Sequence, residues 1–498
     1  MKHLSLVVII FCALTMNAQN IELPNLTKEQ MRQDIAFLAN AIKDIDPNLP
    51  IRQSVTGSNL YQELDSLVNL SNNLNSFEDF YLLANKLLQL TQDQHHKFLD
   101  YYPFGIEENN PYITAENIEL SKNASQQYGD FIPCCGGIMH VAYISGEYFT
   151  FENIYTTQAL ANDDSLLIPA GAKILSIDNI LINDYVNDFR KIDNATRWSP
   201  SSNSYYTNTI HHPFFLTGAL TPPSVTFSFN GYNETINFVD AYVVGFNWSG
   251  NFSVQYFEKD NILYVRIPEM DYEQIDFLTT EIQKYKSKKI TKVVIDIRYN
   301  DGGSDRVWQS VLSALISEPL TIKSNVYLKN TPLVRNYVTN IRHEKIAREF
   351  EINGTKYIDT DIDEFDTISP FENSLNYNGK IYVLVNDRIF SSSLAFVSVC
   401  KQVENLVTVG TPTGLVCGRS TTPFFLSLPN SKLIFELVPC IDMTNKVNPI
   451  DYYDTKAEVP VALTINHYMK EVDNCKQLYT EDFLYNYDTI FQKVLELK

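Results

Sequence analysis

The sequence has few basic residues and few cysteines, and each shortage excludes a class of protein. Its 498 residues carry 39 Lys and Arg against 59 Asp and Glu, which gives a formal net charge of −20. Nucleic-acid binding requires a basic surface, so we expect no nucleic-acid partner. Seven cysteines are too few for a disulfide scaffold, although one or two bridges are compatible with the sequence. No His/Cys spacing typical of a zinc site occurs, so we expect no metal and no cofactor.

Long apolar runs are also missing, which argues against a membrane span. A span needs about 18 or more consecutive apolar residues, and no stretch of the sequence has them. A shorter apolar run, Leu4 to Leu14, follows the positive charge of Lys2 and precedes small or polar residues up to Ala18. This is the pattern of a secretory signal peptide. We therefore expect residues 1–18 to be removed and the protein to be exported, to the periplasm or the exterior.

The first region after the signal is predicted to be an N-terminal helical subdomain, residues 19–110. Thr27 to Gln30 is a capping-box pattern, and apolar residues follow at helical spacing from Met31 to Ile42. The helical periodicity stops at a turn that contains Asp93 and His95. A lone Asp-x-His turn is ordinarily a local hydrogen-bonding feature, so it assigns no function without further evidence.

Residues 111–250 are predicted to form a β domain, because short apolar runs alternate with Gly, Asn and Pro turns. The segment from Ile168 to Asn179 joins a Gly turn, an alternating strand and an Asp-Asn turn, and it is similar to one strand of a PDZ-like module. The glycine-rich carboxylate-binding loop of such modules is missing. A PDZ-like fold and an unrelated small β domain therefore both remain open.

Residues 251–498 are predicted to be an α/β domain. Lys292–Arg298 and Lys380–Asn386 are nearly continuous apolar strands of the kind that is buried on both faces. Gly302 and Gly303 follow the first strand and Ser391 follows the second, each just before an expected helix. Ligands of α/β folds bind at the carboxyl ends of the strands, so these residues are candidates for chemistry. Each also has an ordinary explanation as a tight turn or a helix cap.

The two strand ends together resemble signature segments of the C-terminal processing (tail-specific) serine peptidases. Val294–Gly303 is similar to the family's (I/V)-I-D-L-R-x-N-x-G-G segment, and Val383–Ser393 is similar to its nucleophile segment. Val409–Gly414 and Leu428–Ser431 are similar to two later motifs, and all four occur in the family's order. The resemblance implies an α/β multidomain fold with a helical subdomain, a PDZ-like β module and a peptidase core of the crotonase-like (ClpP/crotonase) type.

The resemblance also implies roles for single residues. Ser391 stands at the nucleophile, and the N–H of Ser392 with that of Gly302 or Gly303 stands at the oxyanion hole. A serine needs a base, and the tricorn-like branch of the family uses a His at the end of the helical region. This branch puts His95 at the base, with His96 as the rival assignment.

Three departures from the family's patterns weaken this assignment. The Ser–Lys branch carries a Lys after the Thr413-Gly414 turn, but this sequence has none there, and Arg419 stays protonated. The acid that should orient the imidazole falls at Asp451, where the glycines and proline of the family's motif are missing. Leu394 also stands where many members carry Glu.

Two functions follow from these observations. The first is an exported serine endopeptidase that hydrolyses a peptide or protein substrate with Ser391 and His95. The alternative is a catalytically inactive protein of the same fold that binds a peptide or an apolar ligand. The retained Ser391 and glycines favour the enzyme, whereas Leu394 and the eroded acid motif favour the binding protein. The sequence assigns no substrate preference, disulfide pairing or oligomeric state.

Overall fold

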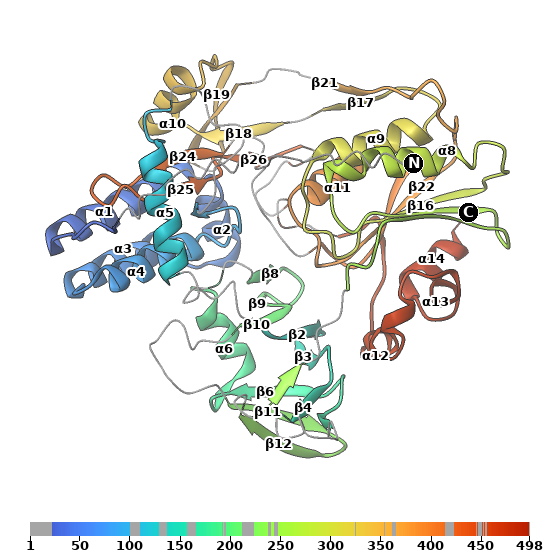
Figure 1. Cartoon of the computed structure of the whole chain (residues 1–498), viewed down its shortest axis with the longest axis horizontal. Helices are drawn as coiled ribbons and strands as arrows, with labels where there is room; N and C mark the ends of the chain where they lie inside the picture. The colour runs from blue at the N-terminus through green and yellow to red at the C-terminus, as the bar shows by residue number, and fades with distance from the viewer. Residues whose placement is uncertain are drawn as a thin grey trace, which may run out of the picture.

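The computed structural model is a mixed helix-and-sheet multidomain fold, which confirms the predicted fold class (Figure 1). The structure describes these residues: 22–99, 110–128, 137–156, 166–191, 193, 196–211, 224–237, 241–243, 248–323, 325–352, 354–360, 365–413, 423–444, 446, 451, 453 and 456–497. The predicted signal peptide and Arg419 lie outside them. Cys400 and Cys475 form no disulfide. Among the described helices, none has the length and apolar character that crossing a bilayer requires.

The helical subdomain consists of α1 (Lys28–Ile45), α2 (Asn48–Thr56), α3 (Leu60–Leu70), α4 (Phe77–Leu90) and α5 (Ala115–Tyr128). α5 lies in the region predicted to be β structure, and it belongs here because Leu120 and Ala124 pack in the same core. The capping box predicted at the start of α1 is confirmed, because the side chains of Thr27 and Gln30 each bond the other's backbone N–H. The core of these helices also contains residues from far along the chain, in β24 (Phe424–Ser427) and β25 (Ile434–Leu437). The predicted boundaries separate these segments, yet they share one hydrophobic core.

The turn of the β24–β25 hairpin is hydrogen-bonded to α1. Leu428–Ser431 forms the turn between β24 and β25, and the backbone N–H groups of Asn430 and Ser431 each donate to the buried Asp34 of α1 at 2.8 Å. β25 also pairs with the short strand β1 (Lys97–Phe98). The chain just after His95 is therefore attached to a hairpin that is itself bound to α1.

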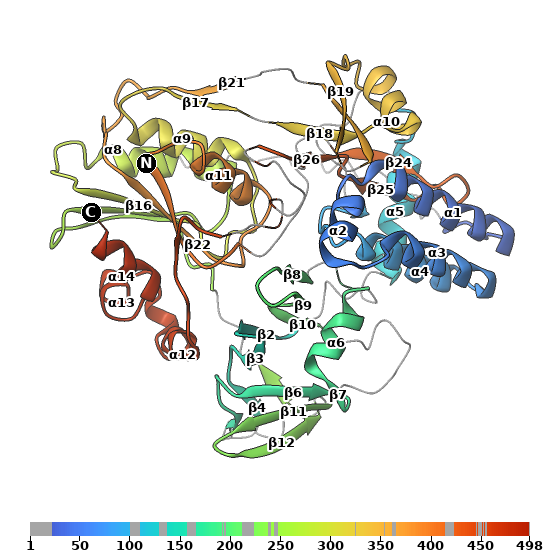
Figure 2. The same cartoon turned by 180° about the vertical axis from the view of Figure 1, so that it is seen from behind.

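The middle region is mostly β structure, and it lies below the other two regions in Figures 1 and 2. Its larger sheet has the order β10-β2-β3-β6-β11-β12, with β7 also paired to β6. The strands are β2 (Gly137–Ile144), β3 (Glu147–Thr150), β6 (Lys173–Ile177), β7 (Ile180–Leu181), β10 (Thr209–His211), β11 (Ser224–Phe229) and β12 (Tyr232–Asn237). The helix α6 (Ile182–Phe189) shares their apolar core. The strand expected within 168–179 is β6, whereas the PDZ-like interpretation stays a prediction.

The α/β core is a six-stranded sheet in the order β14-β15-β16-β22-β23-β27, antiparallel only at β14. The strands are β14 (Ser253–Phe257), β15 (Ile262–Arg266), β16 (Lys292–Asp296), β22 (Ile381–Val385), β23 (Leu406–Gly410) and β27 (Val459–Pro460). One face packs on α8 (Ile275–Gln283), α9 (Asp305–Leu315) and α11 (Ser392–Cys400), and the other on α13 (Glu481–Asn486) and α14 (Thr489–Glu496). Both faces of the central strands are covered, as their continuous apolar sequences predict.

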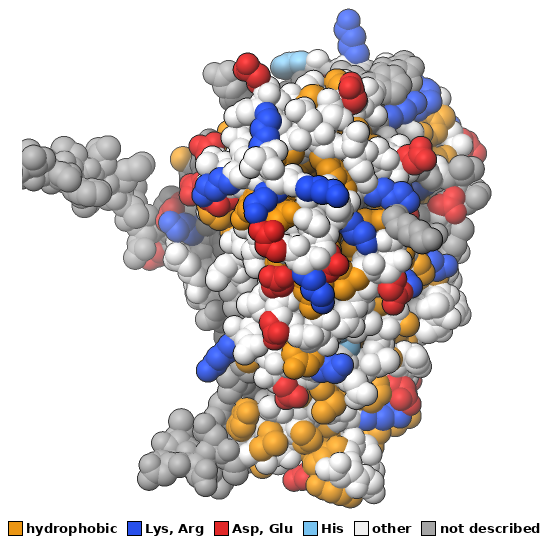
Figure 3. Space-filling model, turned by 90° about the vertical axis from the view of Figure 1, so that its right-hand side faces the viewer, with side chains coloured by type: hydrophobic (Ala, Val, Ile, Leu, Met, Phe, Trp, Pro, Cys, Tyr) orange, Lys and Arg blue, Asp and Glu red, His pale blue; other side chains and the backbone are white. Residues whose placement is uncertain are grey.

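A two-stranded ribbon runs between the α/β core and the helical subdomain (Figure 2). It pairs β17 (Leu320–Lys323) with β21 (Phe365–Ile368), and the chain between them forms β18 (Val326–Lys329), α10 (Pro332–Asn336), β19 (Arg348–Ile352) and β20 (Thr355–Asp359). β18 also pairs with β26 (Cys440–Asp442), which follows the β24–β25 hairpin. The surface in Figure 3 carries charged side chains of both signs close together.

Candidate active site

Ser391 follows β22 and immediately precedes α11. Its backbone is in the left-handed region, with φ 52° and ψ −118°, although it is not a glycine. Such a conformation costs free energy and is concentrated at functional sites. The Ser391 side chain makes no capping bond to α11 in the described structure, so the ordinary N-cap explanation does not account for it.

The hydroxyl of Ser391 meets a histidine of the helical subdomain. His95 Nε2 lies 3.1 Å from Ser391 Oγ, across 296 positions of the sequence. His95 Nδ1 lies 2.9 Å from Asp93 Oδ1, and its ring stacks on Phe390 with centroids 4.5 Å apart. A carboxylate only accepts, so Nδ1 carries the proton and Nε2 presents its lone pair to the serine. This is the tautomer that a general base requires.

Asp93 lies beside His95, where an acid can orient the imidazole. The family resemblance had assigned that role to Asp451. The Asp93 side chain is fully buried, and Oδ1 also accepts from the backbone N–H of His95 at 3.0 Å. Because Asp93 and Ser391 occupy both ring nitrogens of His95, no position beside the ring is left for Asp451. The rival base, His96, is fully buried, and neither of its ring nitrogens has a partner among the described residues. The geometry therefore brings His95 to Ser391 and Asp93 to His95, whereas the catalytic roles given to His95 and Asp451 stay predictions.

The two glycines after β16 lie against the turn that carries Ser391. Gly302 has φ 100°, and a Cβ there would stand 2.7 Å from Ser391 Cβ and 3.0 Å from Ser392 N. Gly303 has φ 129°, and a Cβ there would stand 2.3 Å from the carbonyl oxygen of Met270. Only glycine fits either position, because each combines a positive φ with a backbone close by.

The backbone hydrogen bonds distinguish the two glycines. The N–H of Gly302 donates to Asn300 Oδ1 at 2.8 Å, so it is not available to bind an oxyanion. The N–H groups of Gly303 and Ser392 donate to no group within the described residues. The sequence left Gly302 and Gly303 as equal candidates for the oxyanion hole, and the free N–H groups favour Gly303 with Ser392.

A side-chain contact fixes Ser392 to the helix that follows the glycines. Ser392 Oγ donates to Asp305 Oδ1 at 2.5 Å, and Trp308 Nε1 donates to the same oxygen at 3.1 Å. Asp305 is the first residue of α9, and Trp308 also stacks on Phe396 of α11. The turn before α9 and the turn before α11 are thus joined next to the nucleophile.

Asn300 and Asn386 hold the two strand ends together. Both residues lie in the motifs, but the sequence assigned them no role. Asn300 accepts from the backbone N–H of Phe390 through its carbonyl at 3.0 Å, and its side chain donates to the Ile267 carbonyl at 2.9 Å. Asn386 Oδ1 accepts from the backbone N–H of Tyr299 at 3.0 Å. Their side-chain roles become visible only when the two turns are seen side by side.

A buried ionic network lies beneath this site. Asp296, at the end of β16, accepts from Arg298 Nη2 at 2.6 Å and from the Tyr264 hydroxyl at 2.7 Å, and Arg266 lies 3.5 Å away. Burial alone would raise the pKa of Asp296, but Arg298 and Arg266 outweigh it and lower that pKa. Arg298 also pairs with Asp488 at 2.7 Å. These contacts explain why the Asp and Arg of the I-D-I-R segment can be buried.

Comparisons with known proteins found one family model and several solved structures that are similar to this chain. Residues 261–437 match the model of peptidase family S41. The solved structure of mature CPAF is similar at 13% identity over 91% of this chain and 97% of that chain, with a TM-score of 0.56. CPAF complexed with lactacystin is similar at 14% identity over 91% and 98%, with a TM-score of 0.54. The photosystem II D1 C-terminal processing protease shares 14% identity over 92% and 98%, with a TM-score of 0.41. No curated protein matches the sequence.

The fold and the matched core define the class of this protein as a serine-type peptidase, which is a hydrolase. The predicted resemblance to the C-terminal processing peptidase family is confirmed by the match of residues 261–437 to the model of peptidase family S41.

Proposed function

We propose that this protein is an exported serine endopeptidase in which Ser391 is the nucleophile, His95 the base and Asp93 the group that orients the base. The observation that carries the proposal is the continuous contact from Asp93 Oδ1 through the His95 ring to Ser391 Oγ, at 2.9 and 3.1 Å. A serine hydroxyl is a weak nucleophile on its own, and an imidazole at this distance can accept its proton.

The reaction follows from these positions. Ser391 Oγ attacks the scissile carbonyl carbon while its proton passes to His95 Nε2, and the N–H groups of Gly303 and Ser392 bind the oxyanion. His95 then gives the proton to the leaving amine, and the peptide bond breaks to leave an acyl ester on Ser391. Water, deprotonated by His95, hydrolyses the ester and restores the serine.

Asp93 removes one argument for the alternative function, an inactive binding protein. That alternative depended partly on the eroded motif around Asp451, and an acid two residues before His95 makes that motif unnecessary. Leu394, the other departure, is partly buried and packs on the core of the α/β domain. We therefore retain a peptide or protein as the substrate and hydrolysis as the outcome.

Labelling with a fluorophosphonate, followed by mass-spectrometric mapping, tests the chemistry. We expect an adduct on Ser391 that is absent in Ser391→Ala and forms about 10³-fold or more slowly in His95→Ala. His343→Ala, which changes an exposed histidine, serves as the matched control and should label as wild type does. A folded wild-type protein that forms no adduct on Ser391, or a His95→Ala variant that labels at the wild-type rate, would contradict the proposal.

Export is a separate part of the proposal and has its own test. The apolar run from Leu4 to Leu14 and the small residues up to Ala18 support cleavage after Ala18. Mass spectrometry of the protein recovered outside the cytoplasm of the producing cell should therefore find a chain that begins at Gln19. Recovery of the full-length chain in the cytoplasm alone would contradict export without affecting the proposed chemistry.

A further inference from the structure

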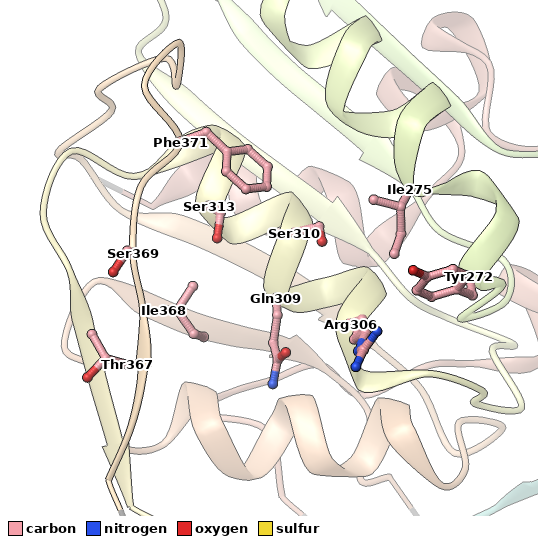
Figure 4. A pocket seen from close by; sticks show the side chains of 10 residues that line it. All are labelled: Tyr272, Ile275, Arg306, Gln309, Ser310, Ser313, Thr367, Ile368, Ser369 and Phe371. Carbon is pink, nitrogen blue, oxygen red and sulfur yellow. The ribbon is translucent and has the colours of Figure 1, made fainter.

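A pocket of about 430 Å³ lies on the outer face of α9, and none of the proposed catalytic residues lines it (Figure 4). Its floor is the side of α9 that carries Arg306, Gln309, Ser310 and Ser313, which share one helix face by their spacing. The remaining lining residues come from the 3₁₀ turn before α8, the first residue of α8, the end of β21 and the segment after it; they are Tyr272, Ile275, Thr367, Ile368, Ser369 and Phe371.

Arg306 is the only charged residue among the described residues that line this pocket, and its guanidinium has no ion-pair partner among them. Each of the other described arginines donates to a carboxylate, a carbonyl or a hydroxyl; these are Arg32, Arg52, Arg190, Arg197, Arg266, Arg298, Arg335, Arg342, Arg348 and Arg388. The Arg306 guanidinium has no such partner among the described residues, and its Cζ lies over the Tyr272 ring, 5.9 Å from the ring centroid. Arg306 is exposed at the pocket, and a guanidinium without an acidic partner among the described residues can bind an anionic ligand there.

The other pocket groups indicate what carries the negative charge. The Gln309 amide and the hydroxyls of Ser310 and Ser313 have no hydrogen-bond partner within the described structure, although Ser313 is only 7% exposed. Tyr272 and Phe371 lie at opposite ends of the pocket, 56% and 40% exposed (Figure 4). A small inorganic anion would use Arg306 alone. An extended peptide would also offer amide groups to the polar floor and side chains to the two rings.

We propose that this pocket is a binding site for a peptide segment that bears a carboxylate, with the carboxylate on Arg306. The carboxylate is that of a Glu or Asp side chain or of a chain terminus, since either forms the same paired hydrogen bonds with a guanidinium. The site is distinct from Ser391 and does not depend on the proposed chemistry, so it can be examined in a protein that cannot turn over its ligand.

Fluorescence anisotropy with the Ser391→Ala protein tests the site. The probes are three fluorescein-labelled peptides: Gly-Ala-Glu-Ala-Phe-NH₂, its Gln counterpart, and the Gln peptide with a free C-terminal carboxylate. We expect a carboxylate-bearing probe to bind about tenfold more tightly than the Gln amide, which is the effect of one charge-assisted hydrogen bond. Arg306→Gln should abolish the difference, and Arg306→Lys should keep part of it.

A matched variant controls for the loss of a positive charge elsewhere on the protein. Arg335→Gln removes an arginine on α10 that is exposed and paired with Glu349, and it should leave the tenfold preference unchanged. A preference for the Glu probe assigns the site to an acidic side chain, and a preference for the free acid assigns it to a chain terminus. Equal binding of all three probes, or a preference that survives Arg306→Gln, would overturn the proposal.

Discussion

The guanidinium of Arg388, three residues before Ser391, donates to the carbonyl of Asn208 at 2.8 Å and to that of Val141 at 3.2 Å. Both acceptors belong to the middle β region. In the opposite direction, Arg197 of that region donates to the carbonyl of Asp387. The turn that carries the proposed nucleophile is therefore held from both sides by a part of the chain that contributes no reacting group.

Arg388→Ala is accordingly expected to lower kcat more than it changes KM. The turn would lose its anchor, and a displacement of about 1 Å at the reacting atoms can cost about 10²-fold in rate. Steady-state kinetics on an unstructured protein substrate measures the change, and Arg388→Lys should restore part of it. A rise in KM with an unchanged kcat would show that Arg388 contacts the substrate instead.

Asp93→Asn should abolish most of the activity while leaving the protein folded. An amide can donate to His95 Nδ1, which favours the wrong tautomer and leaves Nε2 protonated, so kcat should fall by about 10⁴-fold. Asp451→Asn is the comparison, and it should keep a kcat close to that of wild type. The reverse order of the two variants would restore Asp451 as the orienting acid.

Gly303→Ala should disable the oxyanion turn by steric conflict. The added methyl would stand 2.3 Å from the Met270 carbonyl oxygen, so the backbone that offers the Gly303 N–H must move. We expect a fall in kcat of about 10²-fold or more, measured with a chromogenic peptide. Gly354→Ala is the matched control, because its φ is +79° but nothing lies within 4 Å of the added atom. It should reduce stability slightly and leave kcat unchanged.

The buried network around Asp296 predicts a pH dependence of stability. Burial would raise the pKa of Asp296, but Arg298 and Arg266 lower it, so the ionised form favours the folded state. The stabilisation is fully present above the pKa of an unfolded Asp, about 3.9, and is lost as the pH falls through the lower folded value.

Asp296→Asn isolates this contribution. At neutral pH the variant should lose about 3–5 kcal/mol in the free energy of unfolding, because Arg298 and Arg266 would be buried beside a neutral group. The difference from wild type should narrow below pH ~4 in urea titrations, as the wild-type carboxylate is protonated. Asp473→Asn, at an exposed site, should cause little change at either pH. A difference that does not depend on pH would contradict this account.

The sequence determined the parts of this protein that depend on neighbouring residues. The capping box at Thr27, the strands buried on both faces and the strand-to-helix turns at Gly303 and Ser391 follow from short-range pattern, because backbone geometry and side-chain alternation act over a few positions. The motifs also indicated the peptidase family and the pairing of Ser391 with His95. Arg388 lies within the nucleophile segment Val383–Ser393, but the motif assigned its side chain no role.

The tertiary structure decided the choices that depend on competition for hydrogen bonds. Asp93 rather than Asp451 faces His95, and Gly303 rather than Gly302 keeps a free N–H, because Asn300 takes the other. The distance from His95 to Ser391 depends on a helical core that is completed by strands more than 300 residues away in sequence. Hydrogen bonds are fixed by distance and direction in space, and the spacing of residues along the chain contains neither.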